Sequence, residues 1–293
     1  NGQKMWISNA GFAEIFIVFA RIENDKNITA FIMDFDKKNP NGVTLGAEEN
    51  KLGIMSSSTR QVFFGDTLIP VENMLAGRGE GFKIAMNSLN VGRIKLGAAC
   101  LDASRRIISE SVKYGNERIQ FKVPISSFGA IQKKYAEMCT KAFALDAGSY
   151  RAAKDIENMI NALLAEGKSH QDAELLAFQE YAIECAIIKV FGSEVSQFVS
   201  DEGIQIFGGM GFSKDTPMES AWRDARITRI YEGTNEINRL LTVGMLLKKA
   251  MKGEIDLLTP AMEVGNSLMG IPSFDTPDFS VLFSEEKEMI ARL

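Results

Sequence analysis

Gly77-Arg-Gly-Glu-Gly81 marks the point at which the character of this sequence changes. Before it, runs of β-branched and aromatic residues at 14–20, 28–34 and 60–64 are separated by polar turns, which predicts short antiparallel strands. After it, apolar residues recur with a helical period. We therefore expect an α+β protein, with a partial antiparallel β domain followed by an all-α four-helix-bundle domain.

The predicted helical region contains four long stretches joined by links short enough for an antiparallel bundle. These stretches are residues 82–114, 126–165, 172–200 and 235–251. The third stretch carries a broad apolar stripe, which we expect to face the core. The residues of this stripe are Leu175, Leu176, Phe178, Ala182, Ala186, Ile187 and Val190.

The predicted boundaries divide the chain into three parts. Residues 1–80 form the β domain, which we expect to be incomplete because the chain starts within a patterned strand and without an initiator Met. Residues 81–252 form the helical bundle domain. Residues 253–293 contain three prolines, which predicts an irregular C-terminal extension, and we expect this extension to end in a truncated helix.

The composition excludes several classes of protein. The chain has 293 residues, of which 45% are hydrophobic and 24% charged, as in an ordinary globular protein, and its net charge of −5 argues against nucleic-acid binding. No apolar run approaches the ~18 residues of a transmembrane helix, and the first residues resemble neither a signal nor a transit peptide. Cys100, Cys139 and Cys185 are expected to be buried, and with a single histidine, His170, we expect no metal site.

The most unusual segment, residues 223–239, contains a candidate general base. Glu232 lies between Tyr231 and Gly233 and just before Thr234, which is a candidate N-cap for the following helix. A carboxyl group in an apolar pocket has its pKa raised towards the range of a general base, and an adjacent glycine lets a substrate approach. The alternative is a solvated glutamate in a turn between two helices.

Two arginines are candidate ligand contacts. Arg118 closes the first predicted helical stretch, where its guanidinium could bind a phosphate or could simply complement the helix dipole. Arg93 is a charged residue on an otherwise apolar stretch, so it requires either an internal partner or a ligand.

Two further segments suit close contact with a ligand. The stretch 204–212 has three glycines in four positions, which lets the backbone approach a ligand, although a simple helix terminator and turn would have the same composition. Trp6 near the end of the first strand could pack against a flat heterocycle, with the hydroxyl of Ser8 nearby. On local pattern alone, a core position is the favoured interpretation for Trp6.

In their order and spacing, these segments resemble the acyl-CoA dehydrogenase family, over nearly all of the chain up to residue 252. Within the family, residues 128–132, residues 189–194 and the extension beyond residue 252 are most similar to the very-long-chain branch. The stretches that carry the resemblance are residues 2–9, 51–54 with 58–59, 79–82, 118–121, 204–211 and 230–235.

The resemblance implies an FAD enzyme that converts a fatty acyl-CoA thioester into a trans-2-enoyl-CoA. Glu232 would remove the α proton, the hydride would pass to the flavin, and electron-transfer flavoprotein would accept the electrons. The implied substrate contacts are Arg93, Tyr231 and Gly233. The implied FAD contacts are Trp6, Ser8, Arg118, Gln120, Phe121, Gln205, Gly208, Gly209, Thr234 and Glu236, among which Arg118, Gln120 and Phe121 would reach the FAD of a neighbouring subunit.

The resemblance also implies a homodimer or tetramer, located in the cytoplasm of a bacterium or the mitochondrial matrix of a eukaryote. Two positions depart from the family pattern. Lys122 stands where glycine usually follows Arg-x-x-Phe, and Gly92 stands where some branches place the base, which favours Glu232. An acyl-CoA oxidase that uses oxygen and a non-catalytic assembly protein of the same fold remain alternatives.

Overall fold

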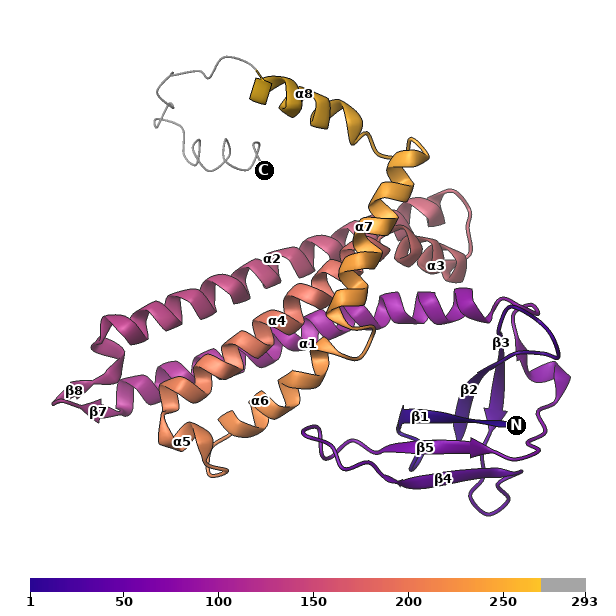
Figure 1. Ribbon diagram of the computed structural model, residues 1–293, viewed down its shortest axis with the longest axis horizontal. Coiled ribbons are helices and arrows are strands. Elements are labelled where there is room, and N and C mark those ends of the chain that lie inside the picture. The colour runs from indigo at the N-terminus through magenta and orange to yellow at the C-terminus, as the bar shows by residue number, and fades with distance from the viewer. Residues whose placement is uncertain (270–293) are drawn as a thin grey trace. The chain divides into compact units, whose positions relative to one another are not determined.

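The computed structural model describes residues 1–269, and the chain divides into two units. The first unit runs from Asn1 to Arg239 and contains the strands and most of the helices, while the second begins at Leu240. Strands occupy the first part of the first unit, drawn in indigo and violet in Figure 1, and long helices follow them. The α+β fold class expected from the sequence is therefore confirmed.

The strand region forms two three-stranded antiparallel sheets, with strand orders β1-β5-β4 and β2-β3-β6. Their shared core is apolar, with Phe16 against Phe35 edge-to-face and with Met33, Val43 and Val62 buried around them. The sequence pattern missed β4, whose flanking and internal glycines were interpreted as turns, and the two-residue strand β6. The strands are β1 (Gly2–Ser8), β2 (Ile15–Ala20), β3 (Thr29–Asp34), β4 (Val43–Glu48), β5 (Thr59–Phe64) and β6 (Met74–Leu75).

Four helices of the first unit pack into a bundle around a core that includes Leu101, Met138, Leu145 and Val199. They are α1 (Gly81–Glu117), α2 (Gly129–Ala165), α3 (His170–Glu180) and α4 (Ala182–Phe207). Two short helices, α5 (Gly209–Phe212) and α6 (Met218–Arg226), return along α4, and α7 (Asn235–Met251) and α8 (Leu258–Met269) follow. A short hairpin, β7 (Ile119–Gln120) and β8 (Val123–Pro124), joins α1 to α2.

Two glycines bring α1 and α4 unusually close together. A Cβ atom on Gly192 would lie 3.1 Å from the Cα atom of Gly97, and a Cβ on Gly97 would lie 2.3 Å from a side-chain carbon of Ile188. Since no larger residue fits at this crossing, the backbones can approach here. Arg93 and Lys189 lie about one helical turn away from these glycines, so the crossing brings two cationic side chains into the same interior region.

The prediction of one continuous helix over residues 172–200 is wrong. The chain forms two helices there, separated at Tyr181, and neither proline nor glycine marks the break. The predicted apolar stripe, which spans the interruption at Tyr181, is not buried as a whole. Ala182, Ala186 and Val190 are buried, and Phe178 is partly buried. Leu175, Leu176 and Ile187 are exposed.

The stretch 235–251 is helical with the predicted bounds, but most of it belongs to the second unit. Within the first unit, α3 packs against α2 and α1 and supplies the fourth helix. The predicted irregular extension is wrong for residues 258–269, which form α8, since Pro260 occupies the first turn of that helix, where proline is tolerated. The predicted truncated helix at the end lies outside the described residues.

The expectation that the three cysteines are buried is confirmed for two of them. Cys100 and Cys185 are buried, but Cys139 is exposed, so the expectation is wrong for Cys139, whose helix turns that position to solvent. Among residues 1–269, no group of histidine, cysteine and acidic side chains could hold a metal ion. No helix in the same range is both long and apolar enough to cross a membrane.

Candidate active site

Glu232 and Gly233 form a left-handed turn just before α7, with φ angles of 58° and 80°. A non-glycine residue in this conformation costs roughly 1–2 kcal/mol, so other interactions must hold it there. Three buried side chains donate hydrogen bonds to the turn. Arg93 Nε donates to the Glu232 carbonyl (3.2 Å), Lys189 Nζ donates to the Gly233 carbonyl (2.7 Å), and Asn238 Nδ2 donates to both (3.3 and 2.8 Å).

The Glu232 carboxyl group is left free of hydrogen bonds at one oxygen. Its Oε2 atom is buried and has no partner, and a Cβ atom on Gly92 would lie 2.7 Å from it. Burial raises the pKa of Glu232, while the charges of Arg93 and Lys189 act in the opposite direction. The alternative of a solvated turn glutamate is therefore wrong, because this carboxyl faces the protein interior beside Gly92.

The residues that flank Glu232 in sequence are more exposed than its carboxyl group. Thr234 Oγ1 accepts a hydrogen bond from the backbone N–H of Ile237 (3.3 Å), which confirms it as the cap of α7. Glu236 is exposed in the first turn of α7, and hydrogen bonds from its own backbone N–H and from Thr234 lower its pKa. Tyr231 is partly exposed on the other side of Glu232.

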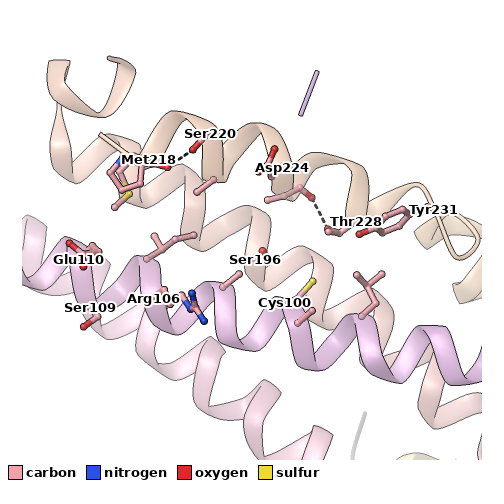
Figure 2. A pocket seen from close by; sticks show the side chains of 17 residues that line it. Cys100, Arg106, Ser109, Glu110, Ser196, Met218, Ser220, Asp224, Thr228 and Tyr231 are labelled. Carbon is pink, nitrogen blue, oxygen red and sulfur yellow. Dashed lines mark hydrogen bonds between the residues drawn. The ribbon is translucent and has the colours of Figure 1, made fainter. Parts of the chain in front are cut away.

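An apolar groove of about 680 Å³ runs between α1, α4 and α6 and has Tyr231 at one end. Figure 2 shows Tyr231, Thr228 and Cys100 towards that end and Ser109, Glu110 and Met218 towards the other. Small and aliphatic side chains form most of its surface, so the groove suits an extended apolar ligand. These side chains are Leu96, Ala99, Ala103, Ile107, Ala221 and Ala225.

Trp6 is 60% exposed, so its interpretation as a core residue is wrong. It lies on β1, which is an edge strand of its sheet, at a bulge in the pairing with β5 between Lys4 and Ile7, and its φ angle is 60°. The bulge turns the indole ring away from the sheet core. Ser8, two residues further along the same strand, is also exposed, so an aromatic plane and a hydroxyl are both accessible at this edge.

A second cluster of predicted residues lies at the far end of the bundle. Arg118 caps the end of α1, and its side chain is exposed together with Gln120. Phe121, at the tip of the β7–β8 hairpin, is 87% exposed. Both interpretations of Arg118 therefore stay open, since the residue ends a helix and also presents its guanidinium to solvent.

The glycine segment adjoins this hairpin. The ring of Tyr114, one turn before Arg118, stacks on Phe207 at 4.1 Å, and its hydroxyl donates to the Phe207 carbonyl, so the ends of α1 and α4 lie together. Gly208 and Gly209 follow directly, and a Cβ atom on either would meet no atom within 4 Å. With Gln205 also exposed, this end of the bundle leaves open space around its backbone.

The two clusters are far apart within one chain. Gly92, which contacts Glu232, and Arg118 are separated by most of α1, which at about 1.5 Å per residue is roughly 40 Å. An extended dinucleotide is shorter than this distance. The structure therefore brings together Arg93, Tyr231, Glu232, Gly233, Thr234 and Glu236 in one place and Arg118, Gln120, Phe121, Gln205, Gly208 and Gly209 in another.

Comparison with protein families identifies the fold. Residues 79–246 match the family described as acyl-CoA dehydrogenase, C-terminal domain, and residues 1–67 match acyl-CoA dehydrogenase, middle domain. The chain belongs to the acyl-CoA dehydrogenase family. It is 43% identical over 268 residues to a probable acyl-CoA dehydrogenase of Bacillus subtilis, an alignment that covers 92% of this chain and 44% of that protein.

Two further relatives agree with this assignment. The very long-chain specific acyl-CoA dehydrogenase of rat mitochondria is 38% identical over 276 residues, covering 92% of this chain and 38% of that protein. The crystal structure of an acyl-CoA dehydrogenase complexed with FAD from Bacillus anthracis superimposes with a TM-score of 0.89 at 43% identity, covering 99% of this chain and 48% of that one. The chain thus spans less than half the length of these relatives.

The two departures from the acyl-CoA dehydrogenase pattern have structural explanations. Phe121 and Lys122 both have positive φ angles, 50° and 72°, as the two-residue turn of the hairpin requires, so glycine is the residue that fits position 122 without strain. At position 92, the backbone lies against the Glu232 carboxyl group. A side chain there would therefore project into the space that Glu232 occupies.

Lys189 is the one buried cation at this site to which the sequence reasoning assigned no role. It is fully buried, and burial lowers its pKa to about 8. A signal was present, because Lys189 interrupts the apolar face of its helix between Ala186 and Val190, and a lysine at a core-facing position requires a partner.

Proposed function

We propose that this chain carries the catalytic base of an FAD-dependent acyl-CoA dehydrogenase, which converts a fatty acyl-CoA into a trans-2-enoyl-CoA. The observation that carries the proposal is the buried, unpartnered Oε2 of Glu232, which follows in sequence on Tyr231, a residue that lines the apolar groove. When bound, FAD would supply the acceptor for the hydride that leaves the β carbon.

Glu232 has the properties that removal of a weakly acidic α proton requires. The α C–H of a thioester loses its proton only to a base that is positioned and desolvated. Burial raises the pKa of Glu232 above its ordinary value, which makes the carboxylate a stronger base, and the free Oε2 has a lone pair that no protein donor occupies. Arg93 and Lys189 keep a fraction of the carboxyl ionised by opposing the effect of burial.

The groove supports a long fatty acyl chain as the substrate. An acyl chain has no hydrogen-bonding groups, so an aliphatic surface such as Ala99, Ala103 and Ile107 binds it through removal of apolar area from water. A volume of about 680 Å³ leaves space for many methylene groups.

The residues present fit FAD, provided that two chains share it. Trp6 and Ser8 offer an exposed ring and hydroxyl suited to a flavin, and Arg118 with Gly208 offers a cation and open backbone suited to a pyrophosphate. Arg118 lies roughly 40 Å from the Glu232 site along α1. The cluster around Arg118 and the cluster around Glu232 therefore cannot contact the same cofactor within one chain. We therefore include a homodimer or tetramer in the proposal, with electron-transfer flavoprotein as the electron acceptor.

The test is anaerobic reduction of the FAD-loaded protein by palmitoyl-CoA, followed by absorption spectroscopy. We expect the flavin band to bleach within the time of turnover and to return on addition of electron-transfer flavoprotein. A band that does not bleach would contradict the proposal and indicate a non-catalytic protein of this fold. Rapid return of the band in air, without the acceptor protein, would indicate an acyl-CoA oxidase instead.

A further inference from the structure

Lys189 is a charged side chain in the interior of the bundle, and the proposed reaction has so far used only the effect of its charge on the pKa of Glu232. It is 0% exposed, and its ammonium donates to the Gly233 carbonyl (2.7 Å) and to Asn235 Oδ1 (2.8 Å). Both partners are uncharged oxygens. Burying an ammonium with neutral partners is costly, so the fold retains a group whose contribution to stability is unfavourable or small.

The second partner of Lys189 is itself held by the same helix. Asn235, the first residue of α7, is 1% exposed, and its amide group donates to Ser193 Oγ (3.0 Å) and to Glu194 Oε1 (3.2 Å) on α4. Lys189 thus connects the Glu232–Gly233 turn to a residue already fixed against α4. Arg93 fixes the same turn from α1 through the Glu232 carbonyl.

We infer that Lys189 is a positioning residue for the proposed dehydrogenation, on which this inference rests: through the Gly233 carbonyl and Asn235 it holds the left-handed turn that keeps Glu232 Oε2 unpartnered beside Gly92. The turn is strained at Glu232, where φ is 58°. Without the ammonium, the Gly233 carbonyl loses its shortest hydrogen bond. The strained backbone at Glu232 can then move towards a more favourable conformation. A shift of the carboxylate by about 1 Å is enough to slow proton abstraction by up to ~10²-fold.

The charge of Lys189 gives this role a signature that a merely structural residue would lack. The charged and titratable groups around the turn are Arg93 and Cys100 on α1, Lys189, Cys185 and Glu194 on α4, and Tyr231 and Glu236 beside Glu232. Of these, Arg93 and Lys189 lower the pKa of Glu232. Removing the positive charge of Lys189 therefore raises the pKa of Glu232, and the base is ionised only at higher pH.

The experiment compares Lys189→Met and Lys189→Gln in the FAD-loaded protein. Methionine preserves the volume and removes both the charge and the donors, whereas glutamine keeps one donor group without the charge. We expect Lys189→Met to lower kcat by about 10- to 100-fold with KM changed by less than about twofold, because a displaced base affects chemistry more than binding. The acidic limb of kcat/KM should move to higher pH in both variants, and kcat of Lys189→Gln should lie between those of Lys189→Met and the parent.

A matched control removes a lysine elsewhere in the bundle. Lys134 on α2 forms an ion pair with Glu202 and is partly buried, and it lies outside the site. Lys134→Met should leave both kcat and the acidic limb unchanged. The inference would be overturned if Lys189→Met had the kcat of the parent protein and an unchanged acidic limb of kcat/KM. It would also be overturned if Lys134→Met lowered kcat as much as Lys189→Met does.

A direct titration of the carboxyl group makes the test independent of turnover. Infrared difference spectra against Glu232→Gln isolate the protonated Glu232 band, and its midpoint in Lys189→Gln should lie at higher pH than in the parent protein. An unchanged midpoint overturns the inference even where Lys189→Met fails to fold. If the parent protein does not reduce its flavin with palmitoyl-CoA, the proposed function fails, but the infrared midpoint still reports whether Lys189 acts on Glu232.

Discussion

Two left-handed turns in this chain are built in opposite ways. In the Glu232–Gly233 turn, buried side chains from α1, α4 and α7 bind the backbone carbonyls. In the Phe121–Lys122 turn, the pairing of Gln120 with Val123 in a short hairpin holds the conformation, and Phe121 is 87% exposed. The first turn is held by long-range contacts and the second by local ones.

This difference indicates which part of the candidate site the chain completes by itself. The Glu232 turn is half-buried and one oxygen of its carboxyl group is fully buried, which under the proposal is the environment of a base. The hairpin presents Arg118 and Phe121 to solvent, so under the proposal its ligand contacts involve the cofactor of a second molecule. We therefore expect substitutions at the half-buried turn to affect catalysis and substitutions at the exposed turn to affect cofactor retention.

The largest effect should follow from removing the base at the half-buried turn. Glu232→Gln keeps the size of the side chain but cannot accept the α proton, so turnover of palmitoyl-CoA should fall by at least ~10²-fold while FAD stays bound. Steady-state rates and the flavin spectrum measure the two quantities. Glu137→Gln, at a surface ion pair on α2, is the matched control and should keep its rate. A Glu232→Gln variant with more than a tenth of the parent rate would sink the assignment of the base.

The next effect concerns the exposed turn. Arg118→Ala removes the guanidinium at the base of the hairpin, and loss of a charge-assisted hydrogen bond of ~1.5–3 kcal/mol should weaken FAD binding by about 10- to 150-fold. Equilibrium dialysis of the flavin measures this affinity. Arg151→Ala removes another exposed arginine, on α2, and should have no effect. If Arg118→Ala retains FAD like the parent, or if light scattering finds a monomer, the exposed turn does not serve a neighbouring cofactor.

A smaller effect is expected from filling the space beside Glu232. A Cβ atom on Gly92 would lie 2.7 Å from Oε2, so Gly92→Ala should displace the carboxyl group and lower kcat by about tenfold, with FAD content unchanged. Gly129→Ala is the control, because a Cβ there meets no atom within 4 Å. Unchanged kcat in Gly92→Ala would mean that the carboxyl group works from another position.

The smallest effect should come from relieving strain at the exposed turn. Lys122 has a φ angle of 72°, so Lys122→Gly should stabilise the hairpin by about 1 kcal/mol relative to Lys122→Ala, which shortens the side chain but keeps the strain. Hydrogen exchange of the Ile125 amide, which donates to the Arg118 carbonyl across the hairpin, reports this difference. Equal protection in the two variants would contradict the explanation given for position 122.

The local sequence pattern was sufficient to predict those elements whose structure depends on interactions between residues close in sequence. The period of apolar residues located α1, α2 and α7, and the hydroxyl of Thr234 identified the start of α7, because helix formation and capping depend on residues within one turn. The neighbours of Glu232 along the chain made it a candidate base, but they did not distinguish it from a solvated glutamate, because the burial of its Oε2 depends on packing. The break at Tyr181 was missed, since no residue with a strong backbone preference marks it.

The tertiary structure alone decided what surrounds these residues. Lys189 meets Gly233 and Arg93 meets Glu232 across 44 and 139 positions of sequence, and both contacts depend on the close crossing at Gly97 and Gly192. Trp6 is exposed because of a bulge in its pairing with a strand more than fifty residues away. Burial and charge at a site are sums over neighbours from different elements, so the residue types of the site follow from sequence, whereas the pKa and the accessibility of each follow from packing.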